Sequence, residues 1–211
     1  MNLALVATIF TVFIVLLASV VWWRTHHAHS ELSRKFVHIT VGSFVAFWPF
    51  FLSWGEIQLL SVAFLVVVSL SKYLHIFRAI HSVQRPTWGE LFFALAVGSV
   101  TLITHNKYIY MTALLQMSLA DGLAAVVGVR YGLGHAYKVF RHTKTIIGSL
   151  TFFLIATLLL VLYLHVGNAS IAPLSLLGLA AVATLIENCG VAGLDNLLVP
   201  VVVACGLRLL A

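Results

Sequence analysis

Asp121 is the residue in this sequence that points most directly to chemistry, because it lies inside a long apolar run, MTALLQMSLADGLAAVVGVRYG. A carboxylate inside a membrane-spanning segment is costly and is by default a functional group. We expect it to bind Mg²⁺, which prefers carboxylate oxygens beside phosphates, or to act as a general base. A polar contact between helices is the structural alternative, and the sequence leaves it open.

The segment after Asp121 combines glycines, cations and hydroxyls. Glycine lets a backbone approach a ligand closely, and the free N–H groups of a helix N-terminus bind phosphate. We therefore predict a phosphate-binding segment formed by Gly128, Gly132, Gly134, Lys138, Arg141, Lys144, Thr145, Gly148 and Ser149. A basic loop with ordinary turn glycines is the alternative. The segment contains neither a Walker A motif nor Gly-x-Gly-x-x-Gly, so it matches no standard nucleotide motif.

Two earlier segments carry ionisable residues that also have structural explanations. Arg34, Lys35 and His38 are spaced to share one helical face, although flanking cations that reach toward the membrane surface fit the same pattern. Thr87-x-x-Glu90 precedes an apolar run and fits a capping box, so capping and function are equally compatible with Glu90.

The segment ATLIENCGVAGLDNLLVP, residues 183–200, places Glu187 at the end of one apolar run and Asp195-Asn196 at the start of the next. Either Asp195 or Asn196 can serve as a plain helix N-cap. Two acids and an amide across one short connection also suit a site for a metal and a phosphate.

Membrane helices must position these residues, because the chain is 62% hydrophobic and only 9% charged. Soluble domains carry roughly 25% charged residues. We predict an all-α polytopic integral membrane protein with a single domain, residues 1–211. Crossing a bilayer takes roughly 20 apolar residues. We expect about eight spans, near residues 3–22, 36–53, 57–74, 90–104, 109–128, 147–166, 171–187 and 195–210.

The distribution of charge predicts an orientation. If the loop at 23–35 is cytoplasmic, ten cations fall on that side, namely Arg24, Arg34, Lys35, Lys72, Arg78, Arg85, Arg130, Lys138, Arg141 and Lys144. Only Lys107 and Arg208 fall on the other side. This positive-inside pattern predicts both termini outside. Most acids share the cytoplasmic side, which suits a site for a charged, water-soluble reagent.

Five segments occur in the order found in the dolichol kinase, phytol kinase and CTP-dependent diacylglycerol kinase family. They are RKFVHITVG (34–42), RPTWGE (85–90), DGLAAVVGVRYG (121–132), TKTIIGSL (143–150) and ATLIEN with LDNLLVP (183–200). The chain resembles this polyprenol kinase family from about residue 31 to the C-terminus. Residues 1–30 then form an extra N-terminal span and loop.

The resemblance implies an enzyme that uses CTP and Mg²⁺ to phosphorylate a lipid alcohol, either an isoprenoid alcohol of the polyprenol or phytol type or diacylglycerol. The catalytic residues that we expect are Arg34, Lys35, Asp121, Lys144 and Glu187. The expected metal ligands are Asp121, Glu187 and Asp195. Asn196 joins the segment residues above as a nucleotide contact, and Glu90 and His38 are weaker candidates.

The sequence departs from the family pattern at Ala120, Ile147 and Leu194, where relatives often carry glycine, an acid and aspartate. The alternatives are a cytidylyltransferase that forms a CDP-lipid and a small membrane transporter, which needs a polar path across the bilayer.

The partners that we expect are a lipid alcohol and a nucleoside triphosphate, with no nucleic acid, and homo-oligomerisation is left open. The compact chain favours a bacterial inner membrane with the site facing the cytoplasm.

Overall fold

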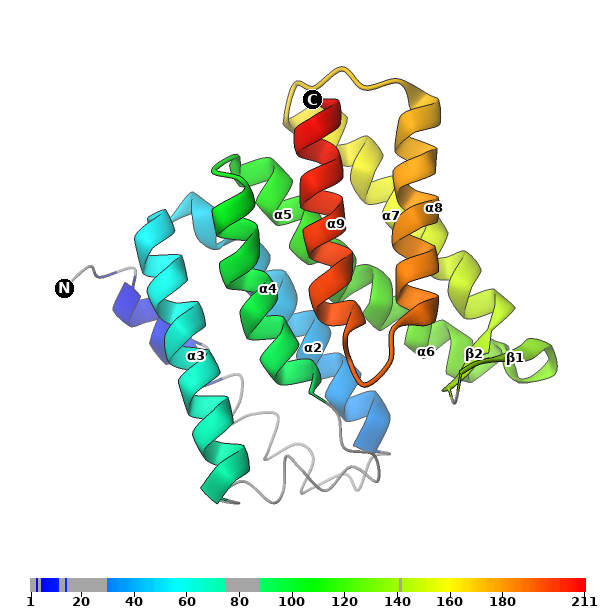
Figure 1. The fold of residues 1–211 in the computed structure, drawn as a ribbon, viewed down its shortest axis with the longest axis horizontal. Helices are drawn as coiled ribbons and strands as arrows, with labels where there is room; N and C mark the ends of the chain where they lie inside the picture. The colour runs from blue at the N-terminus through cyan, green and yellow to red at the C-terminus, as the bar shows by residue number, and fades with distance from the viewer. Residues whose placement is uncertain (1–2, 4, 12–13, 15–29, 75–87, 141) are drawn as a thin grey trace.

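The structure is a computed structural model that describes residues 3, 5–11, 14, 30–74, 88–140 and 142–211, and it is mostly helical (Figure 1). Its main helices are α2 (Ser30–Ala46), α3 (Trp54–Leu74), α4 (Gly89–Ile103), α5 (Lys107–Leu115), α6 (Asp121–Tyr131), α7 (Ile146–Val166), α8 (Pro173–Cys189) and α9 (Asp195–Leu210). Shorter helical segments are η1 (Trp48–Phe50), the π-helix η2 (Gln116–Ala120) and η3 (Leu133–His135). A helix therefore occupies each apolar run predicted from residue 36 onward.

Two described helical segments are long and apolar enough to cross a membrane. Lys107–Tyr131 joins α5, η2 and α6 into 25 residues with a mean hydropathy of 1.5, and α7 has 21 residues with a mean hydropathy of 2.4. Only 33% of the apolar stretch of α7 is buried, and its surface carries Leu150, Leu154 and Leu158. An extended apolar surface of this kind suits contact with lipid. Trp54–Leu70, Gly89–Ile103 and Pro173–Cys189 are apolar but shorter.

The core lies around α5, which packs against α2, α7 and α9. Tyr110 and Leu114 of α5 are fully buried in it, as is Phe152 of α7. Small residues let the helices approach closely: a Cβ added to Gly122 would lie 2.1 Å from Cγ1 of Ile39. Close backbone approach at small residues is the usual way that helices pack in membranes.

Helix α3 begins with a capping box that the sequence analysis did not identify. The Ser53 N–H and hydroxyl each donate to Glu56 Oε2 at 2.8 Å, and the Glu56 N–H donates to Ser53 Oγ at 3.4 Å. The box was predicted instead at Thr87 and Glu90. There the cap position is Trp88, which makes no side-chain cap, and Thr87 lies outside the described residues.

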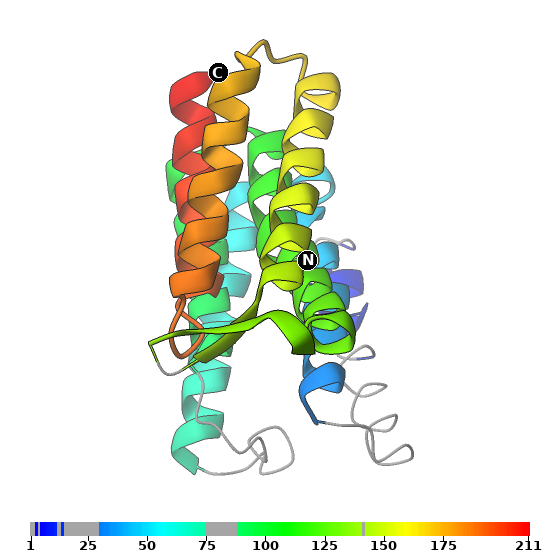
Figure 2. The ribbon, with the colours of Figure 1, turned by 90° about the vertical axis from the view of Figure 1, so that its right-hand side faces the viewer.

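A two-stranded antiparallel hairpin departs from the predicted all-α fold. It consists of β1 (Ala136–Val139) and β2 (His142–Thr145), with Tyr137 opposite Lys144 and Lys138 opposite Thr143. Figure 2 shows it passing beneath the ends of α7 and α8. Strands of four residues are too short for a periodic pattern to distinguish them from a loop, which explains the difference.

The described cations separate between the two ends of the bundle. Lys35 and Lys144 lie at the end that carries the buried acids. At the other end, Lys107 lies 5.9 Å from the ring centroid of Phe50, and Arg208 donates to the backbone at the end of α4. This separation follows the predicted division of charge. Arg24, Arg78, Arg85 and Arg141 lie outside the described residues, as do the side chains of Arg34 and Lys72.

Candidate active site

Three carboxylates from three helices meet at one end of the bundle. Asp121 begins α6, Glu187 lies in the last turn of α8 and Asp195 begins α9. One oxygen from each carboxylate lies within 4.8 Å of the other two. Like charges this close repel one another, and an all-oxygen donor set is the one that hard divalent cations prefer. The three predicted metal ligands are therefore brought together in an arrangement that fits Mg²⁺.

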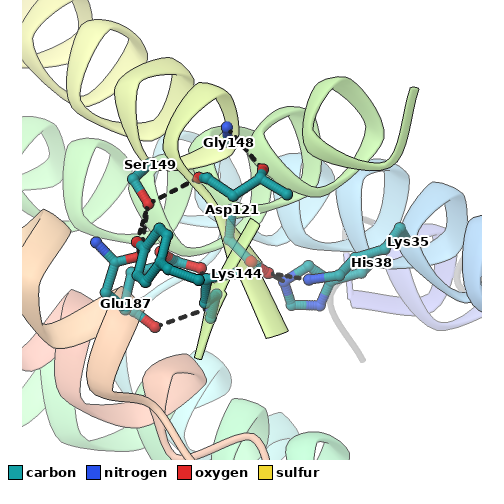
Figure 3. A network of polar contacts seen from close by, with 10 residues as sticks. Lys35, His38, Asp121, Lys144, Gly148, Ser149 and Glu187 are labelled. Atoms are coloured by element: carbon teal, nitrogen blue, oxygen red, sulfur yellow. Dashed lines mark hydrogen bonds and ion pairs between the residues drawn. The ribbon is translucent and has the colours of Figure 1, made fainter. Parts of the chain in front are cut away.

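Two lysines approach this carboxylate cluster, defined as Asp121, Glu187 and Asp195, from opposite sides (Figure 3). From α2, Lys35 Nζ lies 2.6 Å from Asp121 Oδ2, and the two side chains are only 13% and 8% exposed. From β2, the Lys144 ammonium pairs with the Glu187 carboxylate and donates to the Glu187 backbone carbonyl at 3.0 Å. When all five groups are ionised, three negative charges face two positive charges and one negative charge is left over.

Lys144 stays positively charged in this setting. Burial would by itself lower the pKa of its ammonium group. The attraction and hydrogen bond of the Glu187 carboxylate, together with the charges of Asp195 and Asp121, outweigh burial and raise the pKa above its ordinary value. The side chain combines full charge with partial exposure beside the carboxylate cluster. Such a group can pass from a carboxylate to a phosphate oxygen.

A π-turn directs Asp121 into the cluster. The Asp121 N–H donates to the Gln116 carbonyl, five residues back, which is the π-helical pattern. A continuous α-helix would place residues 116 and 121 roughly 140° apart around its axis. The π-turn instead brings them toward one face. His38 Nε2 lies 3.0 Å from the Met117 carbonyl in this turn and 3.7 Å from Asp121 Oδ2. Because a carbonyl only accepts, Nε2 carries the proton.

A neutral hydrogen-bond network lies beside the cluster, and two of its three residues were missed by the sequence analysis. The Tyr137 hydroxyl donates to Asn188 Oδ1 at 2.9 Å, and the Ser149 hydroxyl lies 2.7 Å from the same oxygen. The hydroxyls of Tyr137 and Ser149 are 2.6 Å apart. Ser149 was predicted as a nucleotide contact. The signals for Asn188 were its position next to Glu187 and its place in the resembling segment ATLIEN, and Tyr137 had none.

The predicted phosphate-binding glycines pack helix α6 against α7. A Cβ on Gly128 would lie 2.8 Å from Thr145 Oγ1, and one on Gly132 would lie 2.5 Å from Thr145 Cβ. Thr145 is the N-cap of α7, and its hydroxyl accepts from the Gly148 N–H at 3.0 Å. One N–H group at the start of α7 is therefore already bonded. Gly134 is exposed and has open space around it.

Of four other predicted residues, Lys138 is the one that the described structure places away from the cluster. Lys138 lies next to Tyr137 on β1, so its side chain points to the opposite face of the hairpin from Lys144, and it is exposed. Glu90 lies in the first turn of α4. Arg141 and the side chain of Arg34 lie outside the described residues, so their roles stay predictions.

Asn196 joins the start of α9 to α4. Its buried side-chain amide donates to the Gly89 carbonyl at 3.1 Å. In the preceding loop, Gly193 adopts a φ of +90° and lies so close to Gly89 that an added Cβ would be 2.6 Å from its Cα. The N-cap of α9 is Leu194, so neither Asp195 nor Asn196 takes the predicted cap position. The observed contact of Asn196 positions the neighbouring Asp195.

Comparison with known proteins gives a close relative. A phytol kinase of Synechocystis sp. is 35% identical over 179 residues, which cover 81% of this chain and 76% of that protein. The chain belongs to the polyprenol/phytol kinase family. The resemblance predicted from the five sequence segments is thereby confirmed. No family model and no solved structure matches the chain.

Within this family member, four of the five resembling segments supply the cluster and its two lysines. Segment 34–42 carries Lys35, 121–132 carries Asp121, 143–150 carries Lys144, and 183–200 carries Glu187 and Asp195. The departures at Ile147 and Leu194 lie in the first turn of α7 and at the N-cap of α9. The three carboxylates converge although both positions are apolar.

Proposed function

We propose that this polyprenol/phytol kinase family member is a CTP-dependent lipid-alcohol kinase that phosphorylates an isoprenoid alcohol of the phytol or polyprenol type. The observation that carries the proposal is the convergence of Asp121, Glu187 and Asp195 with Lys35 and Lys144 at one end of an apolar bundle. A lipid hydroxyl and a water-soluble nucleotide can meet there. Diacylglycerol is the second acceptor class that the family resemblance implies.

Phosphoryl transfer depends mainly on positioning and on the neutralisation of charge. Lys144 binds the triphosphate, and Lys35 neutralises charge on the transferred group. Asp121, Glu187 and Asp195 would hold Mg²⁺, which supplies positive charge to the phosphate oxygens when bound. The bond between the γ-phosphorus and its bridging oxygen breaks as the alcohol oxygen bonds to that phosphorus. The hydroxyl proton passes to Asp121 or Glu187, and CDP leaves.

We further propose a topology of eight spans with both termini outside and the carboxylate cluster on the cytoplasmic side of a bacterial inner membrane. Four described cations, Lys35, Arg130, Lys138 and Lys144, belong to segments at the cluster end, as the positive-inside rule requires of a cytoplasmic face.

The exposed thiol of Cys189, at the end of α8 beside Glu187, offers a direct test of this orientation. In a Cys205→Ser background, a membrane-impermeant maleimide should label Cys189 in inverted vesicles and leave it unlabelled in spheroplasts. Labelling in intact spheroplasts would place the cluster outside.

The test of the activity uses purified protein, Mg²⁺ and a panel of lipid alcohols with two labelled forms of CTP. Label should reach phytol or a polyprenol from the γ-phosphate and not from the cytidine. Transfer of cytidine label would instead identify a cytidylyltransferase. Transfer of neither label, from CTP or from ATP, would overturn the kinase proposal and favour a transporter.

A further inference from the structure

The hairpin β1–β2 carries Lys144, yet it is too small to hold its own position. A two-stranded hairpin is marginally stable at best in water, and this one has four residues in each strand. Its turn includes Phe140 with a φ of +52°, a conformation that costs energy for a residue with a side chain. The placement of Lys144 therefore depends on contacts between the hairpin and the helices.

Among the described residues, three side chains from the paired strands hydrogen-bond to α7 or α8. Thr145 caps α7 where β2 joins that helix, and the other two, Lys144 and Tyr137, attach the hairpin beyond this junction. Lys144 pairs with the Glu187 carboxylate and also bonds its backbone carbonyl. The Tyr137 hydroxyl donates to Asn188 of α8 and lies 2.6 Å from the Ser149 hydroxyl of α7. Tyr137 and Lys144 are directly opposite each other in the antiparallel register, so the two attachments share one face of the hairpin.

These two attachments differ in what a nucleotide would do to them. A triphosphate attracts an ammonium group, so Lys144 must weaken its bonds to Glu187 in order to bind one. Tyr137 carries no charge, and its partner Asn188 Oδ1 already accepts two hydrogen bonds from hydroxyls. Both hydroxyls already donate their protons to Asn188 Oδ1, so the network can stay intact while Lys144 changes partner.

We propose that the Tyr137–Asn188–Ser149 network is a tether that keeps the hairpin over the carboxylate cluster while Lys144 moves from Glu187 to the nucleotide. Tyr137 and Asn188 are then positioning residues for nucleotide binding, and they act through Lys144. Ser149, predicted as a nucleotide contact, belongs to the same tether. The expected effect of this tether on the KM for CTP rests on the proposed kinase function. Its expected effect on the stability of the hairpin does not.

The experiment compares the full-length variants Tyr137→Phe and Asn188→Ala with a matched control, Tyr131→Phe. Tyr131 lies at the end of α6 near the hairpin and is 62% exposed. Two quantities are measured in detergent: amide hydrogen exchange over residues 136–145 without nucleotide, and the KM values for CTP and for the lipid alcohol.

The tether predicts faster exchange across the hairpin in Tyr137→Phe and Asn188→Ala, with the control unchanged. It also predicts a KM for CTP that rises about tenfold, the equivalent of one lost hydrogen bond, with an unchanged KM for the alcohol. The double variant should be no worse than either single variant, because both remove the same attachment.

Unchanged exchange in Tyr137→Phe would overturn the tether. Faster exchange with an unchanged KM for CTP would reduce the network to a purely structural role and would also overturn the proposal. If the wild-type protein transfers no phosphate while exchange changes as expected, the kinase function has failed and the tether stands.

Discussion

The substitution Asp195→Asn separates the chemistry of the carboxylate cluster from its contribution to stability. Asp121 and Glu187 each have a lysine partner, whereas none of the described ion pairs includes Asp195. Asparagine keeps the shape of the side chain and removes its negative charge. The variant should therefore lose phosphoryl transfer while the folded protein keeps its stability, or gains some.

The magnitude follows from the separation of the charges. At 4.8 Å and an effective dielectric constant of about 20, two carboxylates repel by about 3.5 kcal/mol, and Asp195 takes part in two such repulsions. The attraction of Lys35 and Lys144 offsets most of this, and partial exposure of Asp195 screens the rest. We expect a gain of zero to about 1 kcal/mol without metal, which corresponds to a Tm higher by at most about 4 °C.

Asp121→Asn provides the contrast. It removes the charged partner of Lys35 from a contact of 2.6 Å between two largely buried side chains. The loss of a hydrogen bond between charged groups costs about 2 kcal/mol, so the Tm should fall by roughly 4–8 °C. Transfer from γ-labelled CTP should fall at least about a hundredfold in both variants.

The assay combines thermal unfolding in detergent, with and without Mg²⁺, and phosphate transfer. Mg²⁺ should raise the Tm of the wild-type protein, because a ligand that binds only the folded state stabilises it, and Asp195→Asn should abolish the rise. Glu56→Gln, at the opposite end of the bundle, is the control that should keep both the rise and the activity. The reasoning is refuted if Asp195→Asn lowers the Tm as much as Asp121→Asn does, or if it transfers phosphate normally.

Three further substitutions test other parts of the structure. Lys144→Met should raise the KM for CTP at least about tenfold, because it removes the charge that binds phosphate; the raised pKa of Lys144 predicts that the wild-type KM stays flat between about pH 7 and 9. Gln116→Leu should raise stability by about 1 kcal/mol in thermal unfolding, because both polar atoms of the buried Gln116 amide lack hydrogen-bond partners; a loss would show that the amide is bonded. Gly122→Ala should cost about 2 kcal/mol, because its Cβ would lie 2.1 Å from Cγ1 of Ile39, and Ile39→Ala should restore the Tm.

Local patterns were sufficient to predict the helices and the family. Apolar runs such as 147–166 and 195–210 became α7 and α9, because an apolar segment in a membrane satisfies its backbone hydrogen bonds internally as a helix. Asp121 stood out because a carboxylate in an apolar run is costly wherever the run packs. The cytoplasmic side of the cluster, its metal and its nucleotide stay predictions.

The hairpin and the π-turn were not predictable from the same patterns. Four-residue strands carry too little periodicity, and the π-turn at Gln116–Ala120 is supported by a contact from His38, 79 residues away. The glycines at 128 and 148 were singled out for the close approach of a ligand, and the structure shows a neighbouring helix close to them. A glycine pattern alone does not identify what comes close.

The sequence by itself determined which residue types were available and at which end of each helix they stood. Only the tertiary structure decided that Asp121, Glu187 and Asp195 share one site, that Lys138 faces away from it, and that Tyr137 and Asn188 anchor the hairpin. The physical reason is that the apolar residues of each segment, taken along its own length, are enough to make it a buried or membrane-spanning helix. The convergence of side chains depends instead on the angles and distances at which the helices cross. Those crossings are fixed jointly by small residues that lie far apart in the chain.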